Sequence, residues 1–125
     1  MNQVEKEILE SIISIDKENE TTINAKVKFS EDFIGFNGHF IEQPVLPGIC
    51  ILELIKCILQ KYLKHKLMIT EIVSAKFFNI IAGKETVDVA ITMEENKGLE
   101  ILVKASINRS YMKKSLIKLR LKRLN

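Results

Sequence analysis

The chain is poor in residues that bend or cross-link a polypeptide: its 125 residues include two prolines, five glycines and two cysteines. It also has no tryptophan. Two cysteines are too few for the disulfide framework of a small secreted domain. Cys50 and Cys57 fall on one predicted helix, where helical rise alone separates them by about 10 Å, too far for a disulfide between them. We interpret both as small apolar core residues.

Long hydrophobic runs and targeting signals are also lacking. No apolar stretch approaches the length of a membrane span. The first ten residues carry three glutamates and one lysine, unlike a secretory signal. We therefore expect a cytoplasmic protein with no membrane span. Hydrophobic residues at 46% and charged residues at 28% indicate a globular protein, and the length fits a single domain over residues 1–125.

Charge is unevenly distributed along the chain. Residues 1–60 have a net charge of −5 and residues 61–125 of +8, which sum to +3. The C-terminal segment SLIKLRLKR places Lys118, Arg120 and Lys122 on one face of a predicted strand. This face is interpreted either as protection of a sheet edge or as a docking surface for an acidic partner. Such a stripe is insufficient evidence for a nucleic-acid partner.

Apolar patterning, with clean alternation in several segments, predicts six strands and a polar turn at Lys17–Asn19 after the first. A helical turn before Ile8 is the alternative at the start of the chain. The predicted strands cover residues 8–15, 21–29, 68–78, 86–94, 99–108 and 115–124. Between the second and third, residues 49–63 have apolar positions around most of a helix circumference, so this helix must be covered. We expect an α+β fold in which a curled antiparallel six-stranded sheet wraps around one long central helix. Exposed sheet edges favour pairing of two chains.

Residues 38–53, GHFIEQPVLPGICILE, combine the parts of an acid/base site. His39 follows a turn signal, and its imidazole titrates near neutral pH. Pro47 fits the first position of the helix, and the N–H of Gly48 suits developing negative charge on a carbonyl oxygen. Glu53 is the lone ionisable residue between Pro47 and Ile55. A buried carboxyl keeps its proton readily, so Glu53 is a candidate proton donor.

Each of these features also has a structural interpretation. A lone loop histidine is usually an exposed residue with no functional role, and a Pro-Gly pair can simply turn the chain into a helix. Glu53 belongs to a helical series that resembles a solvated polar stripe, completed by Lys56, Gln60 and Lys64. The helix alone does not decide between a stripe and a site. The convergence of all three features within sixteen residues favours a site.

The segment resembles the active-site motif of the β-hydroxyacyl-acyl carrier protein dehydratases of the FabZ/FabA type, which have the hotdog fold. The residues that match in type and spacing are His39, Phe40, Pro44, Pro47, Gly48 and Glu53. A glutamate rather than an aspartate at position 53 is similar to the FabZ branch. The chain departs from the pattern at Ile41-Glu42, where the family usually has Pro-Gly.

The resemblance implies roles for His39, Glu53, Gly48 and Val45. His39 would take a proton from C2 of a 3-hydroxyacyl thioester, and Glu53 would protonate the departing C3 hydroxyl. The Gly48 N–H would polarise the thioester carbonyl, and the carbonyl of Val45 would orient His39. The residues themselves suggest that the Phe40 ring anchors the loop against the core and that Pro47 starts the helix.

The resemblance also implies a homodimer, or a dimer-based oligomer, with active sites shared between subunits and an acyl carrier protein as partner. The leading hypothesis is dehydration of a carrier-bound 3-hydroxyacyl thioester to the trans-2-enoyl thioester, with no metal or redox cofactor, because Cys, His and carboxylates lack metal-ligand spacing. One alternative is a hotdog thioesterase that uses Glu53 to activate water. Another is a catalytically weak acyl-binding subunit, which the departure at Ile41-Glu42 favours.

Overall fold

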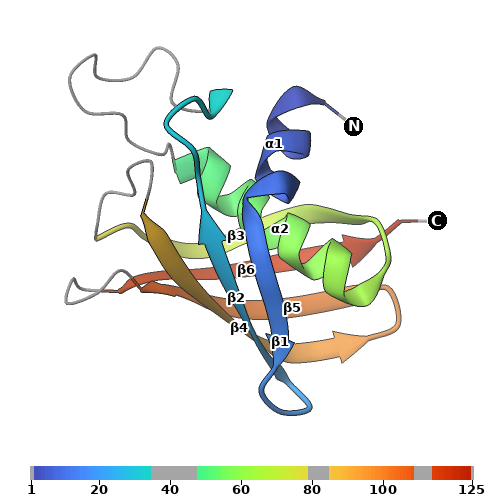
Figure 1. Ribbon diagram of the computed structural model, residues 1–125. Coiled ribbons are helices and arrows are strands. Elements are labelled where there is room, and N and C mark those ends of the chain that lie inside the picture. Colours follow the sequence, from blue (N-terminus) through green and yellow to red (C-terminus); the bar gives the residue numbers. More distant parts are fainter. Residues whose placement is uncertain (1, 35–47, 79–84, 109–113, 125) are drawn as a thin grey trace.

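The computed structural model of the chain describes residues 2–34, 48–78, 85–108 and 114–124. Figure 1 shows a curved sheet with one helix lying across it and a shorter helix beside the first. In chain order the elements are α1 (Gln3–Ser11), β1 (Ile12–Lys17), β2 (Thr22–Lys28), α2 (Gly48–Leu63), β3 (Leu67–Lys76), β4 (Thr86–Lys97), β5 (Glu100–Asn108) and β6 (Ser115–Arg123). Neither of these helices is long and apolar enough to cross a membrane.

The six strands form one antiparallel sheet in the order β1-β2-β4-β5-β6-β3. This confirms the α+β fold and the six-stranded antiparallel sheet predicted from the sequence. The predicted alternation holds on β4, where Val87, Val89 and Ile91 are buried. These side chains belong to the same hydrophobic core as the buried residues of α2, and the residues between them face the other side of the sheet.

Helix α2 supplies the other half of the core. Its buried residues are Cys50, Ile51, Leu54, Ile55, Cys57, Ile58 and Leu59. Burial of each aliphatic side chain contributes roughly 1.5–3 kcal/mol, so packing against the sheet holds α2 in place. The helix ends at Leu63, and the next residue, Lys64, adopts the left-handed backbone conformation (φ 55°) that often terminates helices. Both cysteines are buried and free.

The prediction of a strand over residues 8–15 is wrong for its first part, because residues 3–11 form α1. The side chain of Asn2 caps this helix by accepting a hydrogen bond from the Glu5 N–H at 2.7 Å. Ile8 is fully buried, and α1 packs against α2. The fold therefore has a second helix beside the long central one, and this helix carries Glu5 into contact range of α2.

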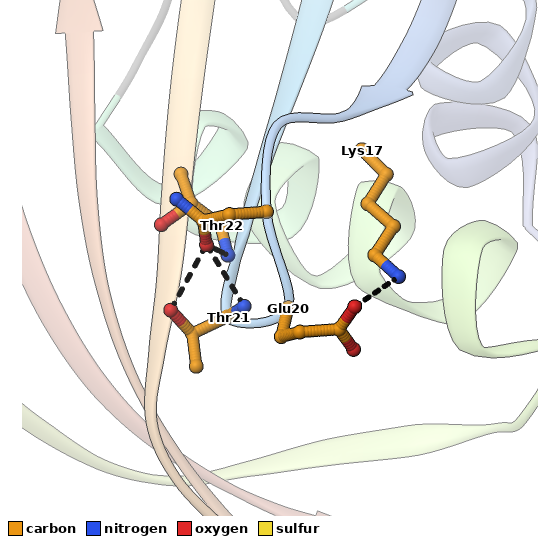
Figure 2. Close-up of polar contacts among 5 residues, drawn as sticks. Lys17, Glu20, Thr21 and Thr22 are labelled. Carbon is orange, nitrogen blue, oxygen red and sulfur yellow. Dashed lines mark hydrogen bonds and ion pairs between the residues drawn. The ribbon is translucent and has the colours of Figure 1, made fainter.

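The β1–β2 connection is a tight polar turn, as predicted. Asn19 Oδ1 accepts hydrogen bonds from the N–H groups of Thr21 and Thr22 and from the Thr21 hydroxyl (Figure 2). Lys17 Nζ lies 2.9 Å from Glu20 Oε1 across the same turn. The asparagine side chain replaces backbone partners that a turn leaves unsatisfied.

One end of the sheet collects the ends of several strands, as the paired residues show: Lys28 with Thr86, Asp88 with Asn108, Ile107 with Ser115, and Lys76 with Leu116. Helix α2 begins at this end, because Gly48 lies against the ring of Phe77, just beyond β3. The start of α2, where the sequence predicts a site, therefore lies beside the end of β3.

Strand β3 is an edge of this sheet and is unusually apolar for an edge. It pairs with β6 on one side. Its large exposed side chains, with those of the two residues that follow it, are Met68, Ile72, Val73, Phe77 and Phe78. An exposed apolar edge strand is a ready template for pairing with another strand.

Candidate functional site

Four of the six predicted site residues lie outside the described residues: His39, Phe40, Val45 and Pro47. The pairing of His39 with Glu53 therefore stays a prediction, as do the roles of the other three. Gly48 and Glu53 are described, and both belong to α2. The geometry of the candidate site is built from these two residues and their neighbours.

Gly48 allows a close contact between the start of α2 and the end of β3. A Cβ atom at this position would lie 3.2 Å from Cε2 of Phe77 and 3.3 Å from its Cζ. The glycine of the Pro-Gly pair therefore has a structural reason of its own, because it leaves room for the ring of Phe77. This packing is compatible with the predicted role of the Gly48 N–H, which concerns the backbone.

Glu53 is half-buried on the second turn of α2 and forms an ion pair. Its Oε1 lies 2.8 Å from Nζ of Lys56, with 27% of the Glu53 side chain and 19% of the Lys56 side chain exposed. The sequence predicted a carboxyl isolated among apolar neighbours, and the structure instead gives it an ammonium partner three residues along the helix. Glu53 and Lys56 thus share one face of α2, as the polar stripe interpretation requires.

Lys56 is held as an ammonium by its surroundings. Burial disfavours its charge, but the hydrogen bond from Lys56 to Glu53 and the charges of Glu53 and Glu5 outweigh burial, so the pKa of Lys56 is raised. A buried lysine without such partners would tend to lose its proton. The positive charge beside Glu53 is therefore a fixed feature of the site at neutral pH.

Glu5, from α1, is the residue of this site that the sequence did not reveal. A carboxylate oxygen of Glu5, a carboxylate oxygen of Glu53 and Sγ of Cys57 lie within 4.8 Å of one another. One sequence signal was present, because Asn2 followed three residues later by Glu5 is typical of a helix start. That signal predicts α1, but it does not predict that α1 packs beside Glu53.

The same three residues are a weak candidate for a metal site. Burial, and then the charges of Glu53 and Glu5, raise the pKa of the Cys57 thiol to about 12, so the thiol keeps its proton at neutral pH, whereas metals bind the thiolate. Lys56 already supplies the positive charge that Glu53 contacts. We therefore assign no metal to these residues.

A cavity of about 630 Å³ lies next to the ion pair, between α1, α2, the start of β3 and the end of β6. Its lining combines three leucines with charged and amide groups, including Glu5, Lys56 and Gln60. The side-chain oxygen of Gln60 accepts a hydrogen bond from the N–H of Leu67 at 2.9 Å, which fixes the amide. The volume is in the range of small-molecule sites.

The basic face of β6 is neither a sheet edge nor a row of unpaired cations. β6 lies between β5 and β3, so the interpretation as edge protection is wrong. Lys118 pairs with Glu94 at 3.1 Å, and Arg120 contacts Glu71 at 3.2 Å and Glu95 at 3.7 Å. Carboxylates of β3 and β4 thus neutralise much of the charge expected to attract an acidic partner.

Comparison with known proteins places the chain in a family. A family model described as ApeI dehydratase, ApeI-like, matches residues 15–114. No curated protein matches the sequence. Among solved structures, a chain of the dehydratase heterocomplex ApeI:P from Xenorhabdus doucetiae superposes with a TM-score of 0.75 at 21% identity, over 90% of this chain and 96% of that one.

Two further structures share the fold. An uncharacterized protein from Erwinia carotovora has a TM-score of 0.67 at 23% identity, over 90% of this chain and 93% of that one. A hypothetical thioesterase with coenzyme A from Streptococcus pneumoniae has a TM-score of 0.65 at 8% identity, over 90% and 85% of the two chains. The predicted hotdog fold is confirmed, and the family match covers α2 and the strands β2, β3, β4 and β5. The chain belongs to the ApeI-like dehydratase family, of the FabZ/FabA-like hotdog type.

Proposed function

We propose that this protein dehydrates 3-hydroxyacyl thioesters, bound to an acyl carrier protein, to trans-2-enoyl thioesters and water. The observation that carries the proposal is the position of the Glu53 carboxyl on α2. In a chain of a dehydratase family, a half-buried carboxyl stands on the second turn of α2, five residues after the glycine that starts the helix. A carboxyl held in such a position suits protonation of a leaving hydroxyl.

The proposed reaction needs two proton transfers. His39 accepts the proton of C2, and the electrons of that C–H bond form the C2=C3 double bond. The C3–O bond breaks, and the departing oxygen takes the proton of Glu53 and leaves as water. The Gly48 N–H stabilises the negative charge that develops on the thioester oxygen, the Val45 carbonyl orients His39, and Phe40 and Pro47 shape the loop and helix start around the substrate.

The proposed active unit is a dimer in which His39 of one subunit meets Glu53 of the other. Strand β3 supports this proposal because its exposed side chains include Met68, Ile72 and Val73 on an edge with one neighbour in the described sheet. Antiparallel pairing of two β3 strands would continue the sheet from one subunit into the next and bury these side chains. A cytoplasmic location and a single domain over residues 1–125 stay predictions.

A thioesterase is the second candidate, and the Glu53–Lys56 ion pair favours it. A carboxylate beside an ammonium is suited to act as a base toward water, whereas a general acid must carry a proton. One assay separates the candidates. A purified sample is given a 3-hydroxyacyl thioester of acyl carrier protein, and both enoyl absorbance and free thiol are followed.

Enoyl product without thiol supports dehydration, and thiol without enoyl product supports hydrolysis. The absence of both products supports the acyl-binding subunit. Under the dehydratase proposal, Glu53→Gln and His39→Ala each reduce enoyl formation by at least about a hundredfold. Glu20→Gln is the matched control, since Glu20 is also paired with a lysine three residues away but lies in the exposed β1–β2 turn. A near-normal rate in either site variant would reject the assignment.

A further inference from the structure

Three charged residues from two helices form a compact group beside the proposed acid. Glu53 and Lys56 come from α2 and Glu5 comes from α1, and we call them the carboxylate-lysine cluster. Lys56 Nζ lies 2.8 Å from Glu53 Oε1, and carboxylate oxygens of Glu5 and Glu53 lie within 4.8 Å of each other. The Lys56 ammonium thus pairs with the Glu53 carboxylate and also interacts electrostatically with the Glu5 carboxylate.

This arrangement conflicts with the simplest form of the proposed reaction. A nearby ammonium stabilises the negative form of a carboxyl group, whereas a proton donor must hold its proton until the hydroxyl leaves. The carboxylate of Glu5 resolves this conflict, because it offers Lys56 a second partner. If Lys56 contacts Glu5 instead, Glu53 loses its counterion, and this loss favours uptake of a proton by Glu53.

Resting on the proposed function, we propose that Lys56 and Glu5 are positioning residues for Glu53. In the empty site Lys56 holds the Glu53 carboxylate, and when substrate occupies the site Lys56 shifts its contact to Glu5, which leaves Glu53 free to carry the proton for the leaving hydroxyl. Neither residue donates a proton to the substrate. Lys56 acts by contacting either Glu53 or Glu5, and Glu5 acts by providing the second of these contacts.

The geometry permits this exchange of partners. The lysine side chain is a flexible four-carbon stem that ends in three rotatable N–H donors. Both Lys56 and Glu5 line the cavity of about 630 Å³, so the lysine stem has space to turn from Glu53 toward Glu5. Glu5 stays in reach because α1 is capped by Asn2 and anchored by the buried Ile8.

The other titratable groups near Glu53 in the described structure do not compete for Lys56. Cys50 and Cys57 interact electrostatically with Glu53, and burial is the main cause that raises the pKa of each thiol. Both are therefore neutral at the pH of an assay. Among the described residues, the charged groups beside Glu53 are Lys56 and Glu5, and Lys61 and Lys66 line the cavity next to them.

Protons balance over the proposed cycle. Glu53 takes up one proton from water as Lys56 turns to Glu5, and it passes this proton to the departing oxygen. His39 receives the C2 proton and later releases it to water, so no net proton is consumed. The carboxylate left on Glu53 then forms its ion pair with Lys56 again.

The test measures the pH dependence of kcat for enoyl formation in three variants: Lys56→Met, Glu5→Gln and the double variant. Methionine keeps most of the lysine stem, so packing is largely preserved. We expect Lys56→Met to move the alkaline limb of the profile to higher pH by about one unit. We expect Glu5→Gln to move it to lower pH and to reduce kcat at pH 8 about fivefold, because Lys56 then stays on Glu53.

The double variant distinguishes exchange from a direct charge effect. If Glu5 acts through Lys56, adding Glu5→Gln to Lys56→Met changes the profile little further. An undiminished Glu5→Gln effect in the Lys56→Met background overturns the proposal, and so do unshifted profiles in the single variants. Should Lys56→Met fail to fold, the shift in Glu5→Gln alone decides. Lys17→Met is the control, since Lys17 also pairs with a glutamate at i+3 (Figure 2).

Failure of the proposed function has a different signature. If the wild-type protein forms no enoyl product, dehydration is rejected whatever the variants do. The exchange is rejected when wild-type protein forms enoyl product but the variants titrate as wild type does. A second readout needs no turnover: carbon NMR of the Glu53 carboxyl, followed against pH in wild-type and Lys56→Met protein without substrate, reports the ion pair directly.

Discussion

Phe77, just beyond the end of β3, lies against Gly48 at the start of α2, so close that a side chain at position 48 would press on the ring. A Cβ on Gly48 would lie 3.2 Å from Cε2 of Phe77, slightly inside ordinary contact distance. The Phe77 ring is 44% exposed, so it can move aside. The contact couples the edge strand of the sheet to the helix that carries Glu53.

The Gly48→Ala variant tests how firmly this contact is held. Alanine stabilises a helix over glycine by roughly 0.5–1 kcal/mol, and displacement of the exposed ring costs a similar amount, so the free energy of unfolding should change by less than about 1 kcal/mol. Urea denaturation measures it. A loss above about 2 kcal/mol would show that the ring is fixed. A stable variant with reduced enoyl formation would support the predicted role at the helix start.

The core face of α2 should be far more sensitive than its exposed face. Leu54 is fully buried, so Leu54→Ala leaves a cavity and should cost about 2–5 kcal/mol of unfolding free energy. Ile49 on the same helix is 76% exposed, and Ile49→Ala should cost less than about 1 kcal/mol. Thermal or urea denaturation of both variants provides the measurement. Equal losses would contradict the orientation of α2.

A charge on the β3 edge should separate the proposed dimer. Ile72 is 52% exposed on this edge, and Ile72→Lys places an ammonium in the proposed interface, where like charges from two subunits would meet. Analytical ultracentrifugation should show monomers at concentrations where wild-type protein is dimeric, together with loss of enoyl formation if sites are shared. Ile13→Lys is the matched control, because Ile13 is 59% exposed on β1 at the opposite edge. A dimeric Ile72→Lys protein contradicts the proposed interface.

Alkaline pH should destabilise the fold through Cys57. The pKa of this thiol rises from 9.0 to about 12 on folding, mainly because it is buried. Above about pH 9 the unfolded chain therefore releases a proton that the folded chain keeps, so stability is fully present below pH 9 and declines between pH 9 and about 12. At pH 10 this thiol should lower the free energy of unfolding by about 1 kcal/mol relative to pH 7.

The measurement is urea denaturation at pH 7 and pH 10 for wild-type protein and Cys57→Ala. The alanine variant is less stable at both pH values because of the cavity it creates, but its loss between the two should be smaller by about 1 kcal/mol. Thiol reagents at pH 8 should modify Cys57 only slowly in folded protein, since thiolate is the reactive form. An identical pH dependence in the two proteins would exclude Cys57 as the cause.

The local sequence predicted most of the secondary structure because apolar periodicity reflects which face of an element is buried. The alternation through Val87, Val89 and Ile91 predicted β4, and the apolar circumference of residues 49–63 predicted α2, which spans Gly48–Leu63. The exception was α1, where the apolar run from Ile8 was assigned to a strand. The Asn2 cap and burial of Ile8 against α2 decided for a helix.

Strand order was decided by the tertiary structure. The alternating charges of β6 suggested an edge strand, yet β6 lies inside the sheet, and its cations meet carboxylates from other strands. A periodic pattern indicates that one face of a strand is polar. It cannot indicate whether the solvent or a row of carboxylates lies opposite, because those carboxylates, Glu71 and Glu94 among them, come from strands placed by long-range pairing.

The candidate site divides in the same way. The sequence by itself determined the chemistry offered at residues 38–53, the family resemblance and the helix on which Glu53 stands. Only the tertiary structure brought Glu5 within 4.8 Å of Glu53 and set the cavity beside Lys56. The physical reason is that periodicity records contacts within one element, whereas the approach of α1 to α2 depends on how two separately formed helices pack on a shared sheet.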